Sequence, residues 1–92
     1  MKIYGYQIPT SAWGGTPRIE IPGLIEVVHV GLDPMGDPCV WVAFDPDPVA
    51  SPANALELEV YGTGQQIDTN AQHLGSYVVG RFVWHVYGRL VR

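Results

Sequence analysis

The short run Tyr61-Gly62-Thr63-Gly64 is the first candidate for ligand chemistry in this sequence. Glycines at the end of a strand allow backbone N–H groups to converge on a ligand, and the threonine adds a hydroxyl group. The run is too short for a dinucleotide fingerprint, and we expect no helix after it to direct a dipole at a phosphate. A turn that needs positive φ explains the same glycines without a ligand. The run remains a ligand-binding candidate, because loops at strand ends commonly carry function.

Trp84-His85-Val86-Tyr87 is a second candidate, within an expected strand. Successive side chains in a strand point to opposite faces, so Trp84 and His85 are expected on different sides of the sheet. Trp84 offers a ring on which a base stacks, and His85 offers a hydrogen bond to a phosphate or a base edge. The alternative for His85 is an imidazole that a neighbouring backbone group satisfies.

Two further tryptophans extend the aromatic surface that a ligand would need. Trp41 lies in an expected strand and Trp13 in a loop rich in glycine and proline. Trp13 either folds back as a lid on the core or stacks on a ligand. With Tyr61 and Trp84, these rings are the candidates for stacking.

Arg18 and Arg81 are the positive charges expected within strands. On a β surface such an arginine either pairs with Glu57 or Glu59 across strands, or remains available for an anion. The planar guanidinium group suits a phosphate, because it donates two parallel hydrogen bonds. Both explanations stay open for each arginine.

The titratable residues show no catalytic or metal-binding pattern. The histidines and Cys39 lack the close pairing of zinc ligands, so we expect no metal site. Asp33, Asp37, Asp45 and Asp47 each adjoin a proline in a turn, which explains them without acid–base chemistry. Neither a Gly-x-Ser-x-Gly elbow nor a Cys–His signature is present. We expect no catalytic residue, no cofactor and no enzymatic activity; a phosphodiesterase would need a general base that the pattern does not reveal.

Composition limits the partners and the location. The chain of 92 residues is long enough for a single domain with a modest core. Its net charge of −4 argues against binding DNA or RNA polymers, which need a basic surface, but not against a small phosphorylated ligand. Cys39 is the only cysteine, and neither a signal peptide nor a membrane-spanning run is visible. We expect a cytoplasmic protein.

Strands are the elements expected to position the candidate residues. Ala55 to Thr63 is the central one, because Leu56, Leu58 and Val60 alternate with polar residues. The other expected strands are Lys2 to Ile8, Arg18 to Ile21, Leu24 to Leu32, Cys39 to Phe44 and Tyr77 to Tyr87, the last bent at Gly80. The segments expected as loops or a tail are Pro9 to Pro17, Asp45 to Pro52, Gly64 to Ser76 and Gly88 to Arg92.

The pattern predicts an all-β domain of about six antiparallel strands, in a meander or a small open barrel. Leu24 to Leu32 and Cys39 to Phe44 flank a turn of proline, aspartate and glycine, and are most simply one hairpin. Both segments are apolar on both faces, except for Glu26 and His29, and the chain as a whole is 47% hydrophobic and only 15% charged. Such strands leave sticky surfaces on a monomer, so we expect a homodimer or a larger homo-oligomer.

Five segments in order carry a family resemblance: Lys2-Ile3-Tyr4 with Tyr6, Ile19 to Pro22, Cys39 to Pro46, Val60 to Gly64 and Val83 to Tyr87. Together they resemble a family of short proteins encoded by bacteriophages and prophages and catalogued as a domain of unknown function. The resemblance spans nearly the whole chain. The sequence departs from it in a longer loop at Thr10 to Pro17 and in the residues past Gly88.

The resemblance implies a phage-encoded accessory protein that works in the host cytoplasm, and it supplies no catalytic residues. Some small, acidic, oligomeric phage proteins sequester nucleotide messengers of bacterial antiviral defence in pockets between subunits. We therefore expect a non-enzymatic binding protein for a small nucleotide-derived anion, with aromatic rings on the base and an arginine on the phosphate. The alternative is an accessory protein that inhibits a host protein through an exposed sheet edge or an apolar patch.

Overall fold

The computed structural model describes residues 1–47 and 53–92, which form six strands and one turn of 3-10 helix. The elements are β1 (Lys2–Gln7), η1 (Thr10–Ala12), β2 (Arg18–Leu32), β3 (Pro38–Phe44), β4 (Ala53–Gly62), β5 (Gln72–Val79) and β6 (Phe82–Val91). Within these ranges, no helix is long and apolar enough to cross a membrane. The predicted all-β class with six antiparallel strands is confirmed.

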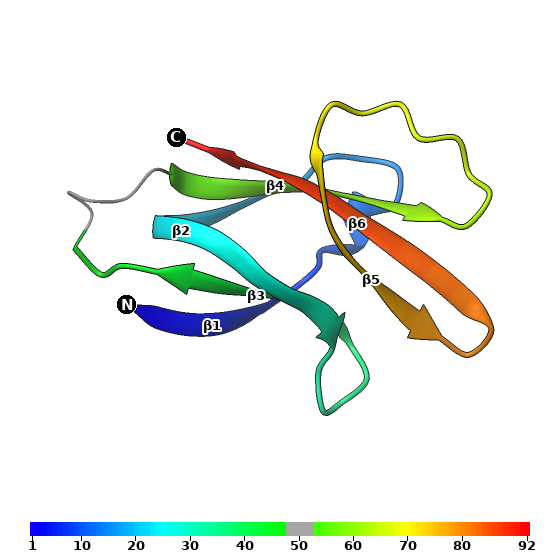
Figure 1. Ribbon diagram of the computed structural model, residues 1–92, viewed down its shortest axis with the longest axis horizontal. Coiled ribbons are helices and arrows are strands. Elements are labelled where there is room, and N and C mark those ends of the chain that lie inside the picture. The colour runs from blue at the N-terminus through cyan, green and yellow to red at the C-terminus, as the bar shows by residue number, and fades with distance from the viewer. Residues whose placement is uncertain (48–52) are drawn as a thin grey trace.

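The strands form one antiparallel sheet in the order β1-β3-β2-β4-β6-β5 (Figure 1). The long strand β2 joins its two halves, because its first residues pair with β4 and its later residues pair with β3. Between these halves β2 bends at Gly23, which has a φ of 82°. The N–H of Asp45 donates to the Gly23 carbonyl oxygen at 2.8 Å, and a β-carbon at residue 23 would collide with the Asp45 carbonyl group. Only glycine fits this bend.

The bend curls the sheet into a half-barrel and brings β5 against the second half of β2. A β-carbon at Gly75 of β5 would lie 2.8 Å from the β-carbon of Val30 in β2. Glycine therefore allows the two strands to approach closely enough to close the curl. The resulting molecule is flat, with dimensions of 42 × 30 × 17 Å.

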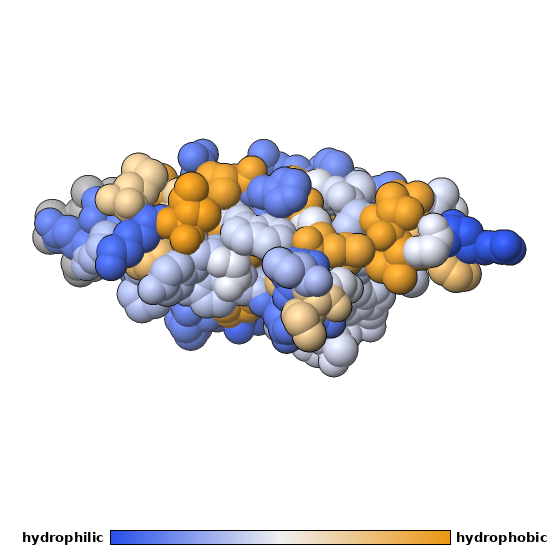
Figure 2. Space-filling view, turned by 90° about the horizontal axis from the view of Figure 1, so that it is seen from below, coloured by the Kyte–Doolittle hydropathy of each residue, from blue (hydrophilic) through white to orange (hydrophobic). Residues whose placement is uncertain are grey.

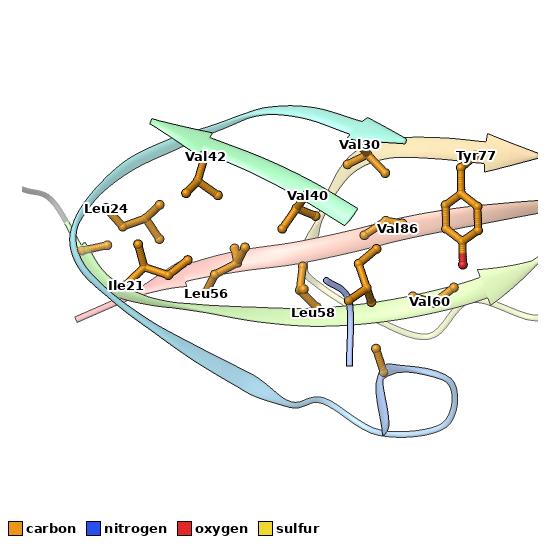
Figure 3. Close-up of a cluster of buried hydrophobic side chains, with 13 residues drawn as sticks. Ile21, Leu24, Val30, Val40, Val42, Leu56, Leu58, Val60, Tyr77 and Val86 are labelled. Atoms are coloured by element: carbon orange, nitrogen blue, oxygen red, sulfur yellow. The ribbon is translucent and has the colours of Figure 1, made fainter. Parts of the chain in front are cut away.

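The inner face of the curled sheet makes one apolar core (Figure 3). Alternation along β4 directs Leu56, Leu58 and Val60 inward, where each is at most 3% exposed. Val86 of β6 lies opposite Val60 and is fully buried. Burial of each such side chain contributes roughly 1.5–3 kcal/mol to stability. The core therefore rests on the alternation that the sequence of β4 displays.

The predicted central strand and the predicted hairpin are confirmed. β4 occupies the expected segment and pairs with both β2 and β6. β2 and β3 form the hairpin, and Asp33 organises its turn. The Asp33 carboxylate accepts hydrogen bonds from the N–H groups of Met35 and Asp37, each at 2.9 Å. This is the turn chemistry expected of an aspartate beside proline and glycine.

The prediction for Tyr77 to Tyr87 was wrong. In place of one bent strand there is a hairpin of β5 and β6, whose two-residue turn is Gly80-Arg81. Gly80 has a φ of 59°, as the first position of a type II′ turn requires. The strands also extend further than expected: β5 begins at Gln72 within the expected loop, and β6 reaches Val91 through the expected tail. Pairing with β6 and β4, respectively, extends them.

Two more expectations differ from the fold. The segments on either side of Pro22-Gly23 were expected as separate strands but are one bent strand, because the backbone there still pairs on both sides of the bend. The strand order is not sequential, so the open-barrel arrangement fits and a simple meander does not. The expected connector Asp45 to Pro52 lies partly outside the described residues.

Candidate functional site

The run at the end of β4 forms a tight turn at which the chain leaves β6. Gln65 N–H donates to the Gly62 carbonyl oxygen at 3.1 Å, and Gly62 N–H donates to the Gln65 side-chain oxygen at 3.0 Å. Gly64 has a φ of 88°, as the third position of a type II turn requires. Gly62 has a negative φ, but a β-carbon there would lie 3.2 Å from the Trp84 ring. Gly64 therefore allows the turn, and Gly62 allows the close packing of Trp84.

The turn between β5 and β6 presents a cation and two apolar side chains beside that run. Arg81 is exposed, and among the described residues it makes no ion pair, unlike Arg18 and Arg89. Phe82 is 63% exposed and Val83 is 36% exposed. Neighbouring exposed apolar side chains beside an exposed guanidinium group are typical of a surface that contacts a ligand or a partner.

These two turns border a hollow of about 500 Å³, here called the notch. It is lined by Gly62, Thr63, Gln65, Arg81, Phe82, Val83 and Trp84. The notch exists because β4 pairs with β6 only as far as Gly62 and Trp84 and then turns away, while β6 extends further (Figure 1). It therefore brings together four residues predicted as ligand contacts: Gly62, Thr63, Arg81 and Trp84.

Aromatic rings support the notch from inside. The half-buried Trp84 ring lies between Phe82, at a centroid distance of 6.4 Å, and Trp13, at 6.3 Å in an edge-to-face arrangement. Trp13 does not line the notch; it packs against the core beside the buried Ala12. The lid explanation of Trp13 is confirmed, and the same lid holds Trp84 in place.

Two predicted ligand contacts lie elsewhere. Trp41 lies on β3, where its ring is 5.3 Å from that of His29 and covers Gly5 of β1. Arg18 lies opposite Glu57 in the β2–β4 pair and forms an ion pair with it at 3.5 Å. The cross-strand explanation is therefore confirmed for Arg18, and neither residue reaches the notch.

Tyr61 belongs to the outer face, by which we mean the face of β4, β5 and β6 opposite the core. Its ring meets that of Tyr87 edge-on at 5.7 Å, and it lines a separate hollow of about 200 Å³ together with Glu59 and the Gly14-Gly15 loop. Partial desolvation, with the nearby carboxylates of Glu59 and Asp68, raises the pKa of Tyr61. The hydroxyl group therefore stays neutral near pH 7.

Carboxylates on the outer face are satisfied by neighbouring strands and loops. Glu57 pairs with Arg89 at 2.9 Å as well as with Arg18, and the hydrogen bond from Arg89 is the main cause that lowers the pKa of Glu57. Glu59 accepts hydrogen bonds from the hydroxyl groups of Thr16, at 3.3 Å, and Thr69. These groups hold each other, which leaves little capacity for a ligand.

His85 also lies on the outer face, but it connects directly to the notch. Its Nε2 lies 2.9 Å from the hydroxyl oxygen of Thr63, and its Nδ1 lies 2.8 Å from the hydroxyl oxygen of Ser76. Ser76 in turn lies 3.3 Å from Nε2 of His73. Side chains, not the backbone, therefore satisfy this imidazole, contrary to the simpler of the two expectations.

Several residues that line the notch or contact His85 were not predicted from the sequence. Gln65, Phe82 and Val83 line the notch, and Ser76 and His73 complete the contacts of His85. A signal for Phe82 and Val83 existed, because two apolar runs separated by Gly80-Arg81 match a hairpin with a two-residue loop. No local signal marked the serine.

The described residues offer no metal centre, since no group of three or more histidine, cysteine, aspartate or glutamate side chains converges among them. Residues 1–91 match a family described as a domain of unknown function (DUF7352). No curated protein and no solved structure matches the chain.

Proposed function

The chain belongs to the DUF7352 family, and we propose that it binds a small nucleotide-derived anion in the notch without transforming it. The observation that carries this proposal is the meeting of two aromatic rings, a glycine-rich turn and Arg81, which forms no ion pair with the described residues, around one hollow. Such a combination matches the two ends of a nucleotide, a flat base and a charged phosphate.

Each part of the notch has a role in this proposal. Trp84 and Phe82 supply the rings on which a base stacks, a contact worth about 1–3 kcal/mol per base. Arg81 donates to phosphate oxygens, since it has no carboxylate partner among the described residues. The side-chain amide group of Gln65 lies in the lining, where it faces the sugar or the base edge of such a ligand. Binding without catalysis is favoured, because the lining contains no carboxylate, histidine or cysteine.

The biological setting that we propose follows the resemblance of the sequence segments. A phage-encoded protein in the host cytoplasm would sequester a nucleotide messenger of antiviral defence, and it would need only affinity and abundance. The acidic charge of −4 suits a small ligand better than a nucleic-acid polymer.

We also propose that the protein is a homo-oligomer. Hydrophobic side chains reach the surface in separate groups along the molecule (Figure 2). Ile3 and Tyr4 of the edge strand β1 are 60% and 56% exposed, and Val78 of the edge strand β5 is 56% exposed. Covering such edges is a common reason for self-association. Light scattering reports the mass directly, and a monomer at micromolar concentration would contradict this part.

A second candidate function is capture of a host protein. The open edge of β5, with Val78, Val79 and the neighbouring Phe82 exposed, offers a template for strand addition. This reading predicts no response to nucleotides and a stoichiometric complex with one host protein.

Thermal melting against a panel of cyclic dinucleotides and ADP-ribose derivatives tests the proposal. A ligand at about 100 times its Kd stabilises by roughly 2.7 kcal/mol, which shifts the melting temperature of a small domain by several degrees. Arg81→Ala should abolish the shift without lowering the melting temperature of the free protein, whereas the charge-matched control Arg92→Ala should keep it. Equal responses of the two variants would remove Arg81 from the site, and no response to any compound would favour the protein partner.

A further inference from the structure

Ser76, His85 and Thr63 form a hydrogen-bonded series on the outer face that the proposed binding in the notch does not use. Ser76 lies on β5, His85 lies opposite it on β6, and Thr63 follows β4. The two bonds of His85, at 2.8 Å to Ser76 and 2.9 Å to Thr63, both lie in the usual distance range of protein hydrogen bonds. A serine, a histidine and a third group that orients the histidine are the parts of an activated nucleophile.

The hydrogen bond between Thr63 and Val83 determines which group donates and which accepts in the rest of the series. The Thr63 hydroxyl group donates to the carbonyl oxygen of Val83 at 3.2 Å, because a carbonyl group only accepts. Thr63 has no second proton, so it accepts the N–H of His85 Nε2. In neutral His85 the other nitrogen, Nδ1, then carries a lone pair and accepts the proton of Ser76. Nε2–H of His73 completes the series by donating to the Ser76 oxygen.

This arrangement gives His85 the tautomer that a general base needs. Its Nδ1 lone pair faces the Ser76 hydroxyl group, and the bond to Thr63 fixes the plane of the imidazole ring. Ser76 is exposed, so a substrate can reach it, while His85 is only partly exposed. The ring of Tyr87 lies 5.1 Å from that of His73 and 5.7 Å from that of Tyr61, so an aromatic pair borders the histidine that bonds to Ser76.

We infer that Ser76 is a nucleophile towards small activated esters with a flat leaving group, and that His85 is its general base. In the step, a bond forms between Ser76 Oγ and the acyl carbon, and the bond from that carbon to the leaving oxygen breaks. The proton of Ser76 passes to His85 Nδ1 and then to the leaving oxygen. Water then completes the cycle: its oxygen bonds to the acyl carbon, the bond from that carbon to Ser76 Oγ breaks, and one proton of the water passes through His85 to Ser76.

Fluorophosphonate labelling of the full chain, read by peptide mass spectrometry, tests this inference. The Ser76 oxygen would bond to phosphorus and fluoride would leave. Ser11 is an internal control in the same folded protein, because it is also exposed and no imidazole lies within hydrogen-bond distance of it among the described residues. We expect Ser76 to react at least about 10²-fold faster than Ser11, the range that general-base catalysis supplies. Equal rates for the two serines would overturn the inference.

Substitutions distinguish the roles of Ser76, His85 and Thr63 in labelling, and they test this inference separately from ligand binding in the notch. Ser76→Ala should remove the labelled peptide, and His85→Gln should slow labelling by about 10²-fold. Thr63→Val should slow it less, and Thr63→Ser should restore it if Thr63 positions the imidazole. The exposed control Arg92→Ala should leave labelling unchanged. Ser76 and His85 do not line the notch, so loss of labelling and loss of nucleotide binding are separate failures. Labelling at full rate in His85→Gln would exclude His85 as the base.

Discussion

Successive side chains of β4 and β6 point alternately to the inner face and to the outer face of the sheet, and the two faces contribute differently to the protein. On the inner face, Leu58, Val60 and Val86 are at most 3% exposed and fill the core. On the outer face, Glu57 and Glu59 bond to arginine and threonine side chains. The inner face thus carries the stability, and the outer face holds polar groups that satisfy one another. Where β4 leaves β6, this mutual pairing ends, and the notch begins with Arg81, which has no carboxylate partner in the part of the chain that the structure describes.

The largest effect should come from the inner face. Leu58→Ala removes buried methyl groups and leaves a cavity, so the free energy of unfolding should fall by about 2–5 kcal/mol. Urea denaturation followed by tryptophan fluorescence measures this loss. The outer-face control Thr16→Ala removes only an exposed hydrogen bond to Glu59 and should cost less than about 1 kcal/mol. Similar losses for the two variants would contradict the division between the faces.

A smaller effect is expected from the charged groups of the outer face, and it should depend on pH. Arg89 and Arg18 hold the pKa of Glu57 below its usual value of 4.5. A lowered pKa in the folded state contributes stability above the usual pKa, and that contribution is lost as the pH falls through the folded value. The stability difference between the wild type and Glu57→Gln should therefore be present at pH 7 and disappear as the pH drops below about 4.5. A difference that is constant from pH 7 to pH 3 would exclude the ion pairs as its cause.

The smallest effect should come from the hydroxyl group that Tyr77 places within the apolar inner face. Among the described residues, the Tyr77 hydroxyl group is buried without a hydrogen-bond partner. Tyr77→Phe should therefore change the free energy of unfolding by less than about 1 kcal/mol, or raise it. Burial also raises the pKa of Tyr77 from 10.0 to about 12. Because the unfolded chain loses this proton first, the wild type should lose stability relative to Tyr77→Phe between pH 10 and 12. A clear loss in Tyr77→Phe at pH 7 would reveal a partner for the hydroxyl group.

Local patterns sufficed to predict much of the fold. Alternation from Ala55 onward predicted the inner face of β4, and the Asp33 turn predicted the β2–β3 hairpin. The strand that contains Phe82 was misjudged, because an isolated glycine signals either a bulge or a turn. The difference depends on whether the flanking segments pair with each other, which is a property of the whole sheet.

The hydrogen-bonded series of Ser76, His85 and Thr63 could not be predicted from the sequence, and the reason is physical. His73 and Ser76 are three residues apart and would point to opposite faces of a regular strand. The register shift between His73 and Gly75 changes the phase, so that both side chains reach the outer face. The pairing of β4 with β6 then sets Thr63 beside His85. A bulge and a long-range register together assemble this group, and neither has a local signature.

The indole N–H resonances of the three tryptophans provide the most direct test of binding in the notch. A titration would use the compound of the nucleotide panel that gives the largest thermal shift, observed by ¹H–¹⁵N correlation NMR. We predict that the Trp84 indole and the backbone amides of Gly62 to Gln65 and of Arg81 shift with saturation, while Trp41, on the far half of the sheet, does not. A titration that moves Trp41 and leaves Trp84 and Arg81 unchanged would contradict the account.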